Sequence, residues 1–344
     1  MILDFEELIG RPKRNVKLTT DEINYFDNLS VAITGGAGSI GSSIAHQLLK
    51  ETNSLVFLID SDESRLHTFF VNLPEALRNR TRTHLADIRD LTSIREVLIK
   101  INPQLVVHAA ALKHVSVLES APREAYLTNI LGTRNVLLAL DNTNIKSFVF
   151  VSTDKAANPI NILGKTKLIG EYLTAFYAQK NASINCGVVR FGNVFLSRGS
   201  VLETFIAQIN LREDLTVTDP EMDRFFIDLE EASALILKTI VEPHSGISIL
   251  KMGQPVLILD LVKKLLKKLG GGVNYRIIGA KPGEKISEEL FTQNELSDAA
   301  DFGDYSFTSF TKKVAIDTLE KYDYSSDAES ANAIDQLLKT SNEI

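Results

Sequence analysis

Cysteine is almost absent from this chain of 344 residues, and its absence excludes two kinds of site. Cys186 is the single cysteine, so neither an intrachain disulfide nor a thiolate metal cluster can form. No second histidine or cysteine stands at metal-ligand spacing from His114, and we expect no metal site. A chain without disulfides fits a reducing cytoplasm, which is the expected compartment.

Blocks of basic charge and long apolar runs are also missing. The 37 basic and 44 acidic residues give a formal net charge of −7, and no basic block resembles a nucleic-acid-binding arm. No apolar run approaches the length that crosses a bilayer, and residues 1–7 lack the basic and apolar regions of a signal peptide. We therefore expect no nucleic-acid partner and no membrane span.

The sequence does contain a strand, a glycine turn and a helix in direct succession. Val31–Ile33 predicts a buried strand, and apolar residues recur at helical spacing after the glycines. The N-terminus of such a helix favours an anion, and glycines let a pyrophosphate approach the backbone. The spacing differs from G-x-G-x-x-G, so a simple tight turn is an alternative. The predicted dinucleotide contacts are Gly35, Gly38, Ser39, Ile40 and Gly41.

Asp60 ends the next apolar run, nineteen residues after Gly41. A carboxylate at this place accepts hydrogen bonds from the adenosine ribose hydroxyls of a dinucleotide and repels a 2′-phosphate. The position therefore favours NAD over NADP as the cofactor. A strand-end aspartate without a ligand is the alternative interpretation.

Strand and helix patterns alternate through the first half of the chain. These patterns predict strands near 83–86, 105–111, 148–151 and 186–190, and helices over 90–101, 121–140 and 161–179. The second half mixes helices with short strands near 215–218, 224–228 and 247–250. The predicted fold class is α/β, a Rossmann-like doubly wound parallel sheet with a smaller mixed α/β substrate-binding lobe.

We expect the chain to have four divisions. Residues 1–29 form an N-terminal leader packed outside the sheet, and residues 30–195 form the NAD-binding Rossmann domain, to which the chain is free to return later. Residues 196–312 form mainly the substrate-binding lobe, and residues 313–344 form a C-terminal helical tail.

The predicted strand at 148–151 delivers Ser152-Thr-Asp-Lys-Ala156 at its carboxyl end, where ligands of open α/β sheets bind. Asp154 beside Lys155 supplies an acid and a base whose charges perturb one another. An exposed turn with a solvated lysine is the alternative. Lys167 follows thirteen residues after Asp154 on the next helix, from which its ammonium reaches a nicotinamide ribose.

In this order, the motifs resemble those of an extended short-chain dehydrogenase/reductase. The implied dinucleotide contacts are Asp87, Ile88, Ala109, Ala110, Asn129, Ser152 and Lys167. The polysaccharide-biosynthesis branch of this superfamily, which contains UDP-N-acetylglucosamine 4,6-dehydratases, is similar at residues 108–115, 151–156, 189–194, 197–201 and 282–285. Residues 7–12 resemble the segment that joins a membrane region to the catalytic domain in larger relatives, and the chain looks like the short, soluble form.

The resemblance implies a redox-neutral dehydration of UDP-N-acetylglucosamine to a UDP-4-keto-6-deoxy sugar for surface polysaccharide or glycan biosynthesis. Tightly held NAD⁺ takes hydride from sugar carbon 4, water leaves across carbons 5 and 6, and hydride returns to carbon 6. By resemblance, Asp154 protonates the departing carbon-6 hydroxyl and Lys155 removes the carbon-5 proton. Ser152 or Thr153 hydrogen-bonds the carbon-4 oxygen.

The chain departs from the superfamily at one position. The tyrosine expected four residues before Lys167 is Leu163, which cannot carry a proton. Asp154 and Lys167 are the candidates for the carbon-4 base, because a neighbouring group within hydrogen-bond reach can recover a lost general base. Loss of activity is the alternative.

The resemblance places recognition of the UDP-sugar largely in the second lobe. A pyrophosphate requires Arg, Lys and amide donors. The implied substrate contacts are Lys113, His114, Asn193, Arg198, Arg224 and Glu284. Glu284 would accept from the uridine ribose hydroxyls, Lys281 stands where relatives often carry arginine, and an ordinary loop histidine is the alternative for His114.

Three functions remain open at this point. The first is the 4,6-dehydratase, the second a UDP-sugar 4-epimerase or a dehydrogenase on the same scaffold, and the third a catalytically silent NAD-binding protein. The pair Asp154 and Lys155 favours the first, because an epimerase needs no acid and base for dehydration. Leu163 favours the third.

Superfamily relatives pair through two long helices, here about 121–141 and 161–180. Both carry large apolar side chains beyond those that one sheet face needs, namely Tyr126, Leu137, Leu138, Leu168, Tyr172, Phe176 and Tyr177. We therefore expect a homo-dimer or a higher homo-oligomer.

Overall fold

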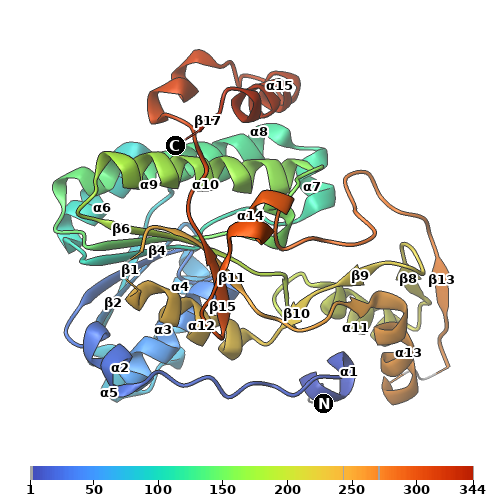
Figure 1. Cartoon of the computed structure of the whole chain (residues 1–344). Coiled ribbons are helices and arrows are strands. Elements are labelled where there is room, and N and C mark those ends of the chain that lie inside the picture. Colours follow the sequence, from blue (N-terminus) through green and yellow to red (C-terminus); the bar gives the residue numbers. More distant parts are fainter. Residues whose placement is uncertain (1–2, 243, 270–271, 344) are drawn as a thin grey trace.

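The computed structural model describes residues 3–242, 244–269 and 272–343. Figure 1 shows a central sheet between two layers of helices, with a smaller lobe beside it. Of the expected N-terminal leader, 1–29, residues 3–29 are described, and of the expected C-terminal tail, 313–344, residues 313–343.

Among the described residues, nine strands form one sheet in the order β14-β15-β11-β6-β5-β4-β1-β2-β3. Its parallel strands from the first half of the chain are β1 (Ser30–Thr34), β2 (Leu55–Asp60), β3 (Thr81–Leu85), β4 (Leu105–His108), β5 (Ser147–Val151) and β6 (Asn185–Arg190). The strand order reverses between β1 and β4, which confirms the predicted doubly wound sheet. Ligands of such sheets bind outside the carboxyl ends of the strands at this switch point.

The chain returns to the large sheet after the second lobe. β11 (Gly246–Leu250) pairs in parallel with β6, and β15 (Tyr305–Thr308) and β14 (Ala300–Asp301) add an antiparallel edge. The run near 247–250 therefore lies in the large sheet, not among the short strands of the second lobe. All five residues of β11 are buried, and a short apolar run does not reveal which sheet will bury it. The division at residue 195 stays a prediction.

Helices cover both faces of the sheet. One face carries α3 (Ser39–Glu51), α4 (Glu63–Asn72), α5 (Glu75–Arg78) and α12 (Leu229–Val241), and the other α6 (Leu91–Ile101), α7 (Val115–Glu119) and α10 (Ile162–Lys180). Apolar periodicity explains the packing, since α3 buries Ile44, Ala45, Leu48 and Leu49 on one side. The side chain of Asp90 caps α6, and Asn102 ends that helix in the left-handed conformation.

The helix predicted over 121–140 is not a uniform α-helix, because its hydrogen-bonding pattern changes along its length. It consists of α8 (Pro122–Ala125), the π-helical turn η1 (Tyr126–Leu131), α9 (Gly132–Ala139) and the 3₁₀ turn η2 (Leu140–Asn142). The π-helical turn contains Asn129, whose side chain bonds to Leu112 and Thr166 outside this helix. Apolar spacing does not distinguish a π-helical turn from an α-helical one, so the sequence predicted a uniform helix.

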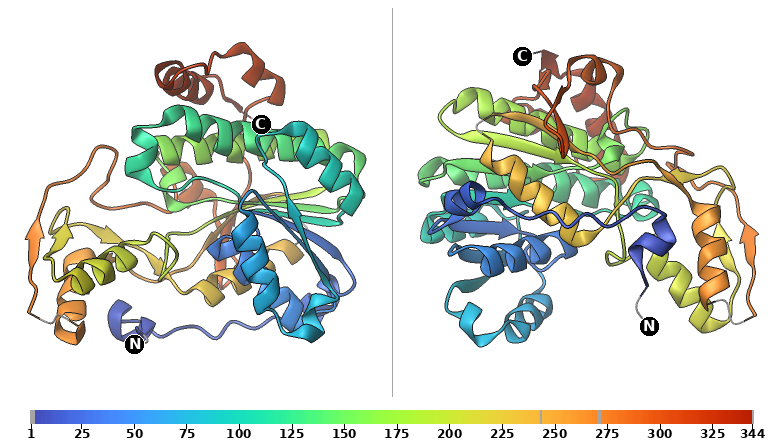
Figure 2. Two further views of the ribbon diagram at one scale, coloured as in Figure 1. Left: turned by 180° about the vertical axis from the view of Figure 1, so that it is seen from behind. Right: turned by 60° about the horizontal axis from the view of Figure 1, so that its bottom comes forward.

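The second lobe packs two helices against short strand pairs. Its elements are β7 (Asn193–Val194), α11 (Val201–Leu211), β8 (Leu215–Val217), β9 (Asp223–Arg224), β10 (Phe226–Ile227), β12 (Val256–Leu257), α13 (Ile258–Leu269) and β13 (Tyr275–Ile277). The N-terminal helix α1 (Phe5–Ile9) shares the apolar core of this lobe. From α1, the chain runs across α12 to α2 (Thr20–Phe26), as the right-hand view of Figure 2 shows.

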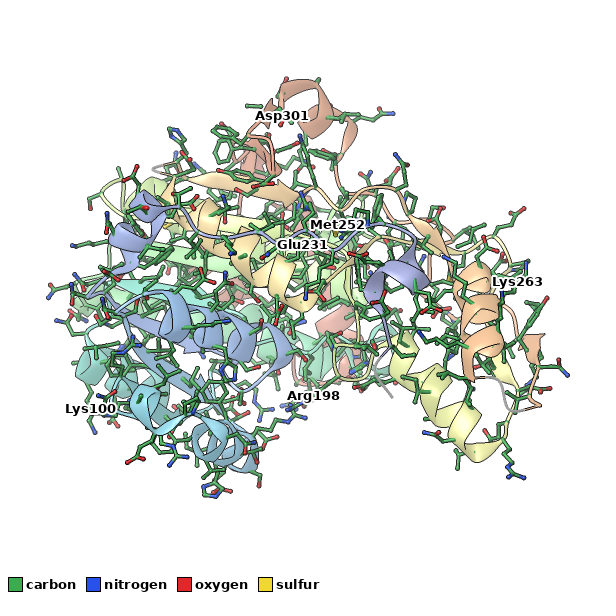
Figure 3. All side chains as sticks on the ribbon, turned by 90° about the horizontal axis from the view of Figure 1, so that it is seen from below. Lys100, Arg198, Glu231, Met252, Lys263 and Asp301 are labelled. Carbon is green, nitrogen blue, oxygen red and sulfur yellow. The ribbon has the colours of Figure 1, made fainter. Side chains whose placement is uncertain are left out.

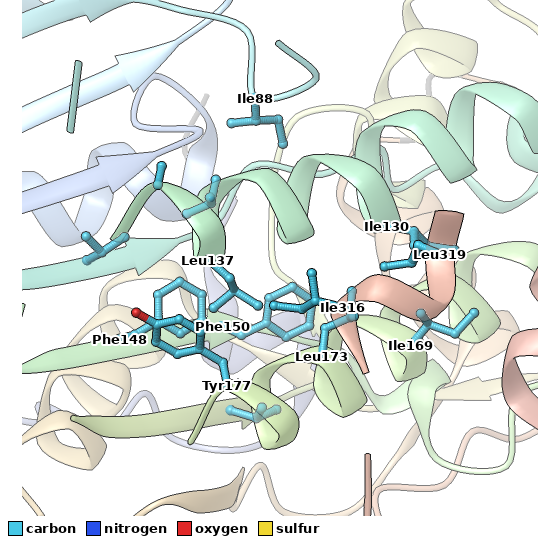
Figure 4. Close-up of a cluster of buried hydrophobic side chains, with 14 of the residues drawn as sticks. Ile88, Ile130, Leu137, Phe148, Phe150, Ile169, Leu173, Tyr177, Ile316 and Leu319 are labelled. Atoms are coloured by element: carbon cyan, nitrogen blue, oxygen red, sulfur yellow. The ribbon is translucent and has the colours of Figure 1, made fainter. Parts of the chain in front are cut away.

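After β15, the chain crosses to the outer side of α8, η1 and α10 (Figure 1). This C-terminal segment contains β16 (Lys312–Lys313), the 3₁₀ turn η4 (Ile316–Lys321), α15 (Asp327–Lys339) and β17 (Asn342–Glu343), and α14 (Gln293–Asp298) precedes β14. Figure 4 shows Ile316 and Leu319 of η4 beside Leu173, Ile169 and Ile130. Tyr324 stacks on Tyr126 with ring centroids 5.1 Å apart.

The C-terminal segment covers the apolar surface that predicts pairing through the long helices. Tyr126, Leu137 and Tyr177 are buried within the single chain. Tyr172 and Phe176 pack against the same cluster. The homo-oligomer stays a prediction. Because the apolar side chains of the two long helices are covered within one chain, they no longer indicate that these helices form the interface. Over the described ranges, no helix is both long and apolar enough to cross a membrane.

Candidate active site

The glycine turn between β1 and α3 leaves the N-terminus of α3 open. Gly35 has φ +65°, and a Cβ on it would stand 2.6 Å from the backbone nitrogen of Ala110. A Cβ on Gly41 would stand 2.3 Å from the Gly35 oxygen. Gly38 is the N-cap of α3, and no side chain in the described ranges caps this helix. Ser39 and Ile40 begin the helix, so their N–H groups face the turn.

Asp60 lies at the carboxyl end of β2, beside this turn. Its Oδ2 accepts from the backbone N–H of Ala37 at 3.0 Å, and its Oδ1 accepts from that of Asp62 at 3.1 Å. These bonds fix the carboxylate next to the glycine turn. Each oxygen keeps a further lone pair for a ribose hydroxyl.

The other predicted dinucleotide contacts differ in their burial and in whether their polar groups already bond to the protein. Ala109 and Ala110 follow β4 and are half-buried, whereas Ile88 is buried against Gly132. The Asp87 carboxylate is held by Arg89 at 2.6 Å. Asn129 is buried, and its side-chain amide hydrogen-bonds to the Leu112 backbone and to the Thr166 hydroxyl. It therefore fixes the loop after β4.

Ser152, Thr153, Asp154 and Lys155 come together at the carboxyl end of β5. Asp154 is fully buried, and its Oδ1 accepts from the Thr153 hydroxyl at 2.8 Å and from Lys155 Nζ at 2.9 Å. Its Oδ2 has no hydrogen-bond partner among the described residues. A Cβ on Gly192 would stand 3.0 Å from Oδ2, so glycine leaves room there. The acid and the base predicted from the sequence are in direct contact.

Two further groups approach Lys155 from elsewhere in the chain. Asn193 Oδ1 lies 3.4 Å from Lys155 Nζ, and Glu288 Oε1 lies 3.7 Å from it. Glu288 was not predicted as a site residue. The sequence offered only its place three residues after the segment 282–285, because its contact with Lys155 depends on the return of the chain to the large sheet.

Ser152 belongs to a buried charged network that the sequence did not reveal. Its hydroxyl donates to Glu171 Oε1 at 2.5 Å, and Arg190 bonds both Glu171 oxygens. Arg190 also bonds Glu295 at 2.8 Å. The single hydroxyl hydrogen of Ser152 points to Glu171 and that of Thr153 points to Asp154, so each hydroxyl already donates to a carboxylate of the protein.

Lys167 lies one helical turn before Glu171 on α10. Its Nζ stands 4.0 Å from the centroid of the Phe150 ring. Burial lowers the pKa of Lys167 to about 7, although the charge of Glu171 opposes the shift. A lysine with this pKa is largely neutral just above neutral pH, so it is able to accept a proton.

His108, at the end of β4, is a buried structural histidine. Its Nδ1 lies 2.6 Å from Thr34 Oγ1, and its Nε2 lies 3.0 Å from Thr133 Oγ1. Burial, and then the charge of Lys167, lower the pKa of His108 to about 3. It therefore stays neutral and ties β1, β4 and α9 together.

Three predicted substrate contacts lie where the loop after β4 and the start of α3 meet residues 197–199. Lys113 Nζ lies 3.4 Å from Ser197 Oγ, and the His114 ring packs so close to Gly199 that a Cβ there would stand 2.4 Å from it. Arg198 is exposed, and its backbone N–H donates to Ser39 Oγ at 3.3 Å. Figure 3 labels Arg198 where the two lobes meet.

Arg224 and Glu284 bond to the chain itself. Arg224 is buried and donates to the backbone oxygens of Lys285 and Ile286 at 2.8 and 2.9 Å. Glu284 accepts from the Lys281 N–H at 3.0 Å. Both side chains thereby hold residues 281–289, which Asn161 also binds through the Gly283 oxygen at 2.8 Å.

Comparison with known proteins shows the family of this chain. A family model described as polysaccharide biosynthesis protein matches residues 31–309. The chain belongs to this family. It is an extended short-chain dehydrogenase/reductase, as the sequence motifs predicted.

Two curated relatives of the family are much longer than this chain. It is 37% identical to the capsular polysaccharide biosynthesis protein CapD of Staphylococcus aureus, over 86% of this chain and 50% of that protein. It is 38% identical to the probable polysaccharide biosynthesis protein EpsC of Bacillus subtilis, over 85% and 49%. The chain thus spans about half the length of these relatives. A UDP-glucose 4-epimerase of Rickettsia felis is 35% identical over 81% of this chain and 82% of its own length.

Solved structures agree with the fold. Pen from Bacillus thuringiensis superposes with a TM-score of 0.78 at 34% identity, over 83% of this chain and 90% of that one. DesIV, a dTDP-glucose 4,6-dehydratase from Streptomyces venezuelae solved with NAD and TYD bound, gives a TM-score of 0.68 at 20% identity, over 82% and 93%. At that identity the second likeness concerns the fold alone.

Proposed function

We propose that this family member is an NAD-dependent nucleotide-sugar 4,6-dehydratase that converts UDP-N-acetylglucosamine to a UDP-4-keto-6-deoxy sugar for surface polysaccharide or glycan biosynthesis. The observation that carries the proposal is the contact of 2.9 Å between Lys155 Nζ and Asp154 Oδ1 at the carboxyl edge of the sheet. An acid and a base side by side are what elimination of water requires. The relatives named for polysaccharide biosynthesis support a role in that process.

The residues around the glycine turn fit NAD. The uncapped N-terminus of α3 offers N–H groups to a pyrophosphate, and Asp60 offers its carboxylate to a ribose. Structures of the same fold, such as a UDP-glucose 4-epimerase from Thermus thermophilus, were solved in complex with NAD. The chemistry that NAD supplies when bound is reversible acceptance of hydride from the sugar. Because Asp60 repels a 2′-phosphate, NAD(H) should bind at least several-fold tighter than NADP(H) in a titration, and equal affinities would contradict this role.

Asp154 Oδ2 is the oxygen that moves protons at carbons 4 and 6. Thr153 and Lys155 occupy Oδ1, whereas no described residue bonds Oδ2. The carboxylate accepts the carbon-4 hydroxyl proton as the ketone forms and later delivers it to the departing carbon-6 hydroxyl. One carboxylate therefore starts and ends the cycle ionised, which makes the tyrosine absent at 163 unnecessary. Lys167, with its lowered pKa, is the alternative carbon-4 base.

Lys155 removes the carbon-5 proton, which the carbon-4 ketone makes acidic, and returns it to carbon 5 after elimination. Asn193 and Arg198, with Lys113 and His114, are proposed to bind the sugar and the diphosphate. Arg224 and Glu284 are proposed to serve the substrate indirectly, because their polar atoms hold residues 281–289.

A UDP-sugar 4-epimerase is the second candidate, because the relative in Rickettsia felis carries that name at 35% identity. Incubation with UDP-N-acetylglucosamine followed by mass spectrometry separates the candidates. The dehydratase is expected to give a product lighter by one water, with no net NADH. An isobaric product that co-elutes with the 4-epimer would support the epimerase. Unchanged substrate would support a silent NAD-binding protein, and either result would overturn the proposal.

A further inference from the structure

We propose that Glu288 is the proton partner of Lys155: it takes a proton from the Lys155 ammonium before the carbon-5 step and gives it back once the product has formed. This inference rests on the proposed dehydratase function. Glu288 acts through Lys155, so it is a positioning residue that prepares the base. The juxtaposition that carries the inference is the Lys155 ammonium, on a side chain that is 12% exposed, between two buried carboxyl groups.

The surroundings of Lys155 Nζ define this arrangement. Asp154 Oδ1 lies at 2.9 Å, Asn193 Oδ1 at 3.4 Å and Glu288 Oε1 at 3.7 Å. The ammonium donates hydrogen bonds to Asp154 and Asn193, and Glu288 lies at ion-pair distance from it. A lysine held in this way has no lone pair for the substrate until one of the acceptors takes a proton.

Glu288 is the acceptor that is built to do so. Its side chain is 1% exposed, and its Oε2 has no hydrogen-bond partner within the described ranges. Burial raises the pKa of Glu288, the charge of Asp154 adds to the shift, and the nearby charges of Lys155, Arg224 and Lys285 oppose it. Asn193, an amide, cannot take the proton.

Hydrogen bonds to backbone oxygens fix the segment that carries Glu288. Arg224 binds the oxygens of Lys285 and Ile286, and Lys285 Nζ binds the Asn158 oxygen at 2.6 Å. Asn158 lies three residues after Lys155 in the chain. The carboxyl group is thus anchored to the same loop that carries Lys155.

Proton counting shows why the reaction needs such a partner. When Asp154 takes the carbon-4 proton it becomes neutral, and Lys155 loses the negative charge that stabilised its ammonium. Transfer of one proton from Lys155 to Glu288 then leaves a neutral amine, which accepts the carbon-5 proton while Asp154 delivers its own to the leaving hydroxyl. Lys155 returns the proton to carbon 5, and Glu288 returns its proton to Lys155. Each group ends as it began, so the cycle needs no net proton transfer to or from the solvent. In deuterium oxide the Lys155 amine carries deuterium, which it can return to carbon 5.

The test is the pH dependence of kcat in Glu288→Gln. In the wild type the transfer is internal, so kcat is expected to change little between pH 7 and 9. In Glu288→Gln the lysine must lose its proton to solvent, so kcat is expected to fall at least tenfold at pH 7 and to recover by up to about tenfold per pH unit. KM for the UDP-sugar should change by less than threefold.

Glu289→Gln is the matched control, because Glu289 is exposed and bonds Asn158 at 2.6 Å. It should keep the wild-type pH profile. A second readout is carbon-5 exchange in deuterium oxide, which should slow in Glu288→Gln while reduction of bound NAD proceeds at the wild-type rate. A uniform loss of kcat at every pH, with exchange and reduction slowed alike, would overturn the proposal and indicate a structural role.

A third measurement does not depend on catalysis. The Glu288 carboxyl is titrated by carbon-13 NMR in protein labelled at the glutamate side-chain carboxyl, and its signal is assigned by its loss in Glu288→Gln. Lys155→Met, or Lys155→Gln if the first variant does not fold, should raise the pKa of Glu288 because the nearest positive charge is gone. An unchanged titration would overturn the partnership even if the enzyme dehydrates its substrate. If the wild type does not release water, the dehydratase proposal fails by itself, and this titration still decides whether the pair is coupled.

Discussion

Leu163 occupies the position at which the superfamily carries its catalytic tyrosine. The leucine is buried in the apolar cluster beneath α10, and its backbone oxygen accepts from the Thr166 hydroxyl. The leucine side chain therefore fills a buried apolar position, into which a phenol would bring a polar hydroxyl. If the proton of the carbon-4 hydroxyl goes to Asp154 or Lys167, the leucine is a packing residue.

Leu163→Tyr is expected to leave the rate unchanged or to lower it, because the larger side chain crowds a buried position. Steady-state kinetics with the UDP-sugar measure this. Leu163→Met, which keeps the volume and stays apolar, serves as the control and should remain close to the wild type. A gain of about tenfold from tyrosine, roughly 1.4 kcal/mol of barrier, would show that the site lacks a base.

Lys167 should make stability depend on pH in a defined direction. Its pKa in the folded chain is about 7, well below the ordinary value of 10.5, so between these values the unfolded chain binds more protons. Stability then rises with pH, by at most about 1.4 kcal/mol per unit. In urea denaturation, Lys167→Met should lack this contribution, and the difference in unfolding free energy should shift in favour of the wild type from pH 7 to 10. A difference that stays constant would mean that Lys167 is charged in the fold.

Among the elements, the N-terminal segment links the two lobes through α12. Arg11 binds Glu231 at 3.0 Å and Arg14 binds it at 2.6 Å, while the Glu231 side chain is 0% exposed. Arg11 also donates to the Phe226 oxygen, and Arg14 donates to the Lys251 oxygen. Figure 3 labels Glu231 beside Met252, where the N-terminal segment crosses α12.

Glu231→Gln should therefore destabilise the protein by about 3 kcal/mol, because it removes the buried counter-charge that two partly buried guanidinium groups share and leaves Arg14 with Asp304 at 3.5 Å. Urea denaturation measures the change. Glu230→Gln is the matched control on the same helix, since Glu230 is 81% exposed and, in the described part of the chain, forms an ion pair with Lys13 alone. It should cost less than about 1 kcal/mol. Equal effects of the two variants would mean that the N-terminal segment adds nothing to the stability of the lobes.

For the whole molecule, the C-terminal segment decides which surfaces are free. It buries Val314, Ile316 and Leu319 together with Ile334 and Leu337 against α8, η1 and α10. Removing residues 313–344 should uncover a large apolar patch, and such patches associate in water. Light scattering at micromolar concentration should then give a larger mass per particle for the truncated chain than for the full chain.

Two outcomes of this comparison are informative. If the truncated chain keeps the mass of the full chain, the uncovered face does not associate, and the cover serves stability alone. If the full chain is already a dimer, its interface lies away from the face that the C-terminal segment covers. The second result would support the predicted homo-oligomer but would place its interface away from the two long helices.

Local patterns specified much of this protein. The strand, glycine turn and helix around Gly35–Gly41, the strand-end Asp60 and the adjacent pair of Asp154 and Lys155 all depend on neighbours within a few residues, so periodicity and turn chemistry suffice to find them. The alternation of strands and helices then implies the parallel sheet, because parallel strands need crossover connections.

Contacts between segments far apart in the sequence could not be predicted and are seen only in the folded chain. Glu288 reaches Lys155, and Glu295 reaches Arg190, only because the chain returns to the large sheet after the second lobe. The use of Arg224 on the backbone and the cover of the long helices by the C-terminal segment have the same origin. The charge or apolarity of a side chain determines which kinds of group it can bind. Which particular residue it contacts depends on the packing of the whole chain, so the sequence alone does not identify a remote partner.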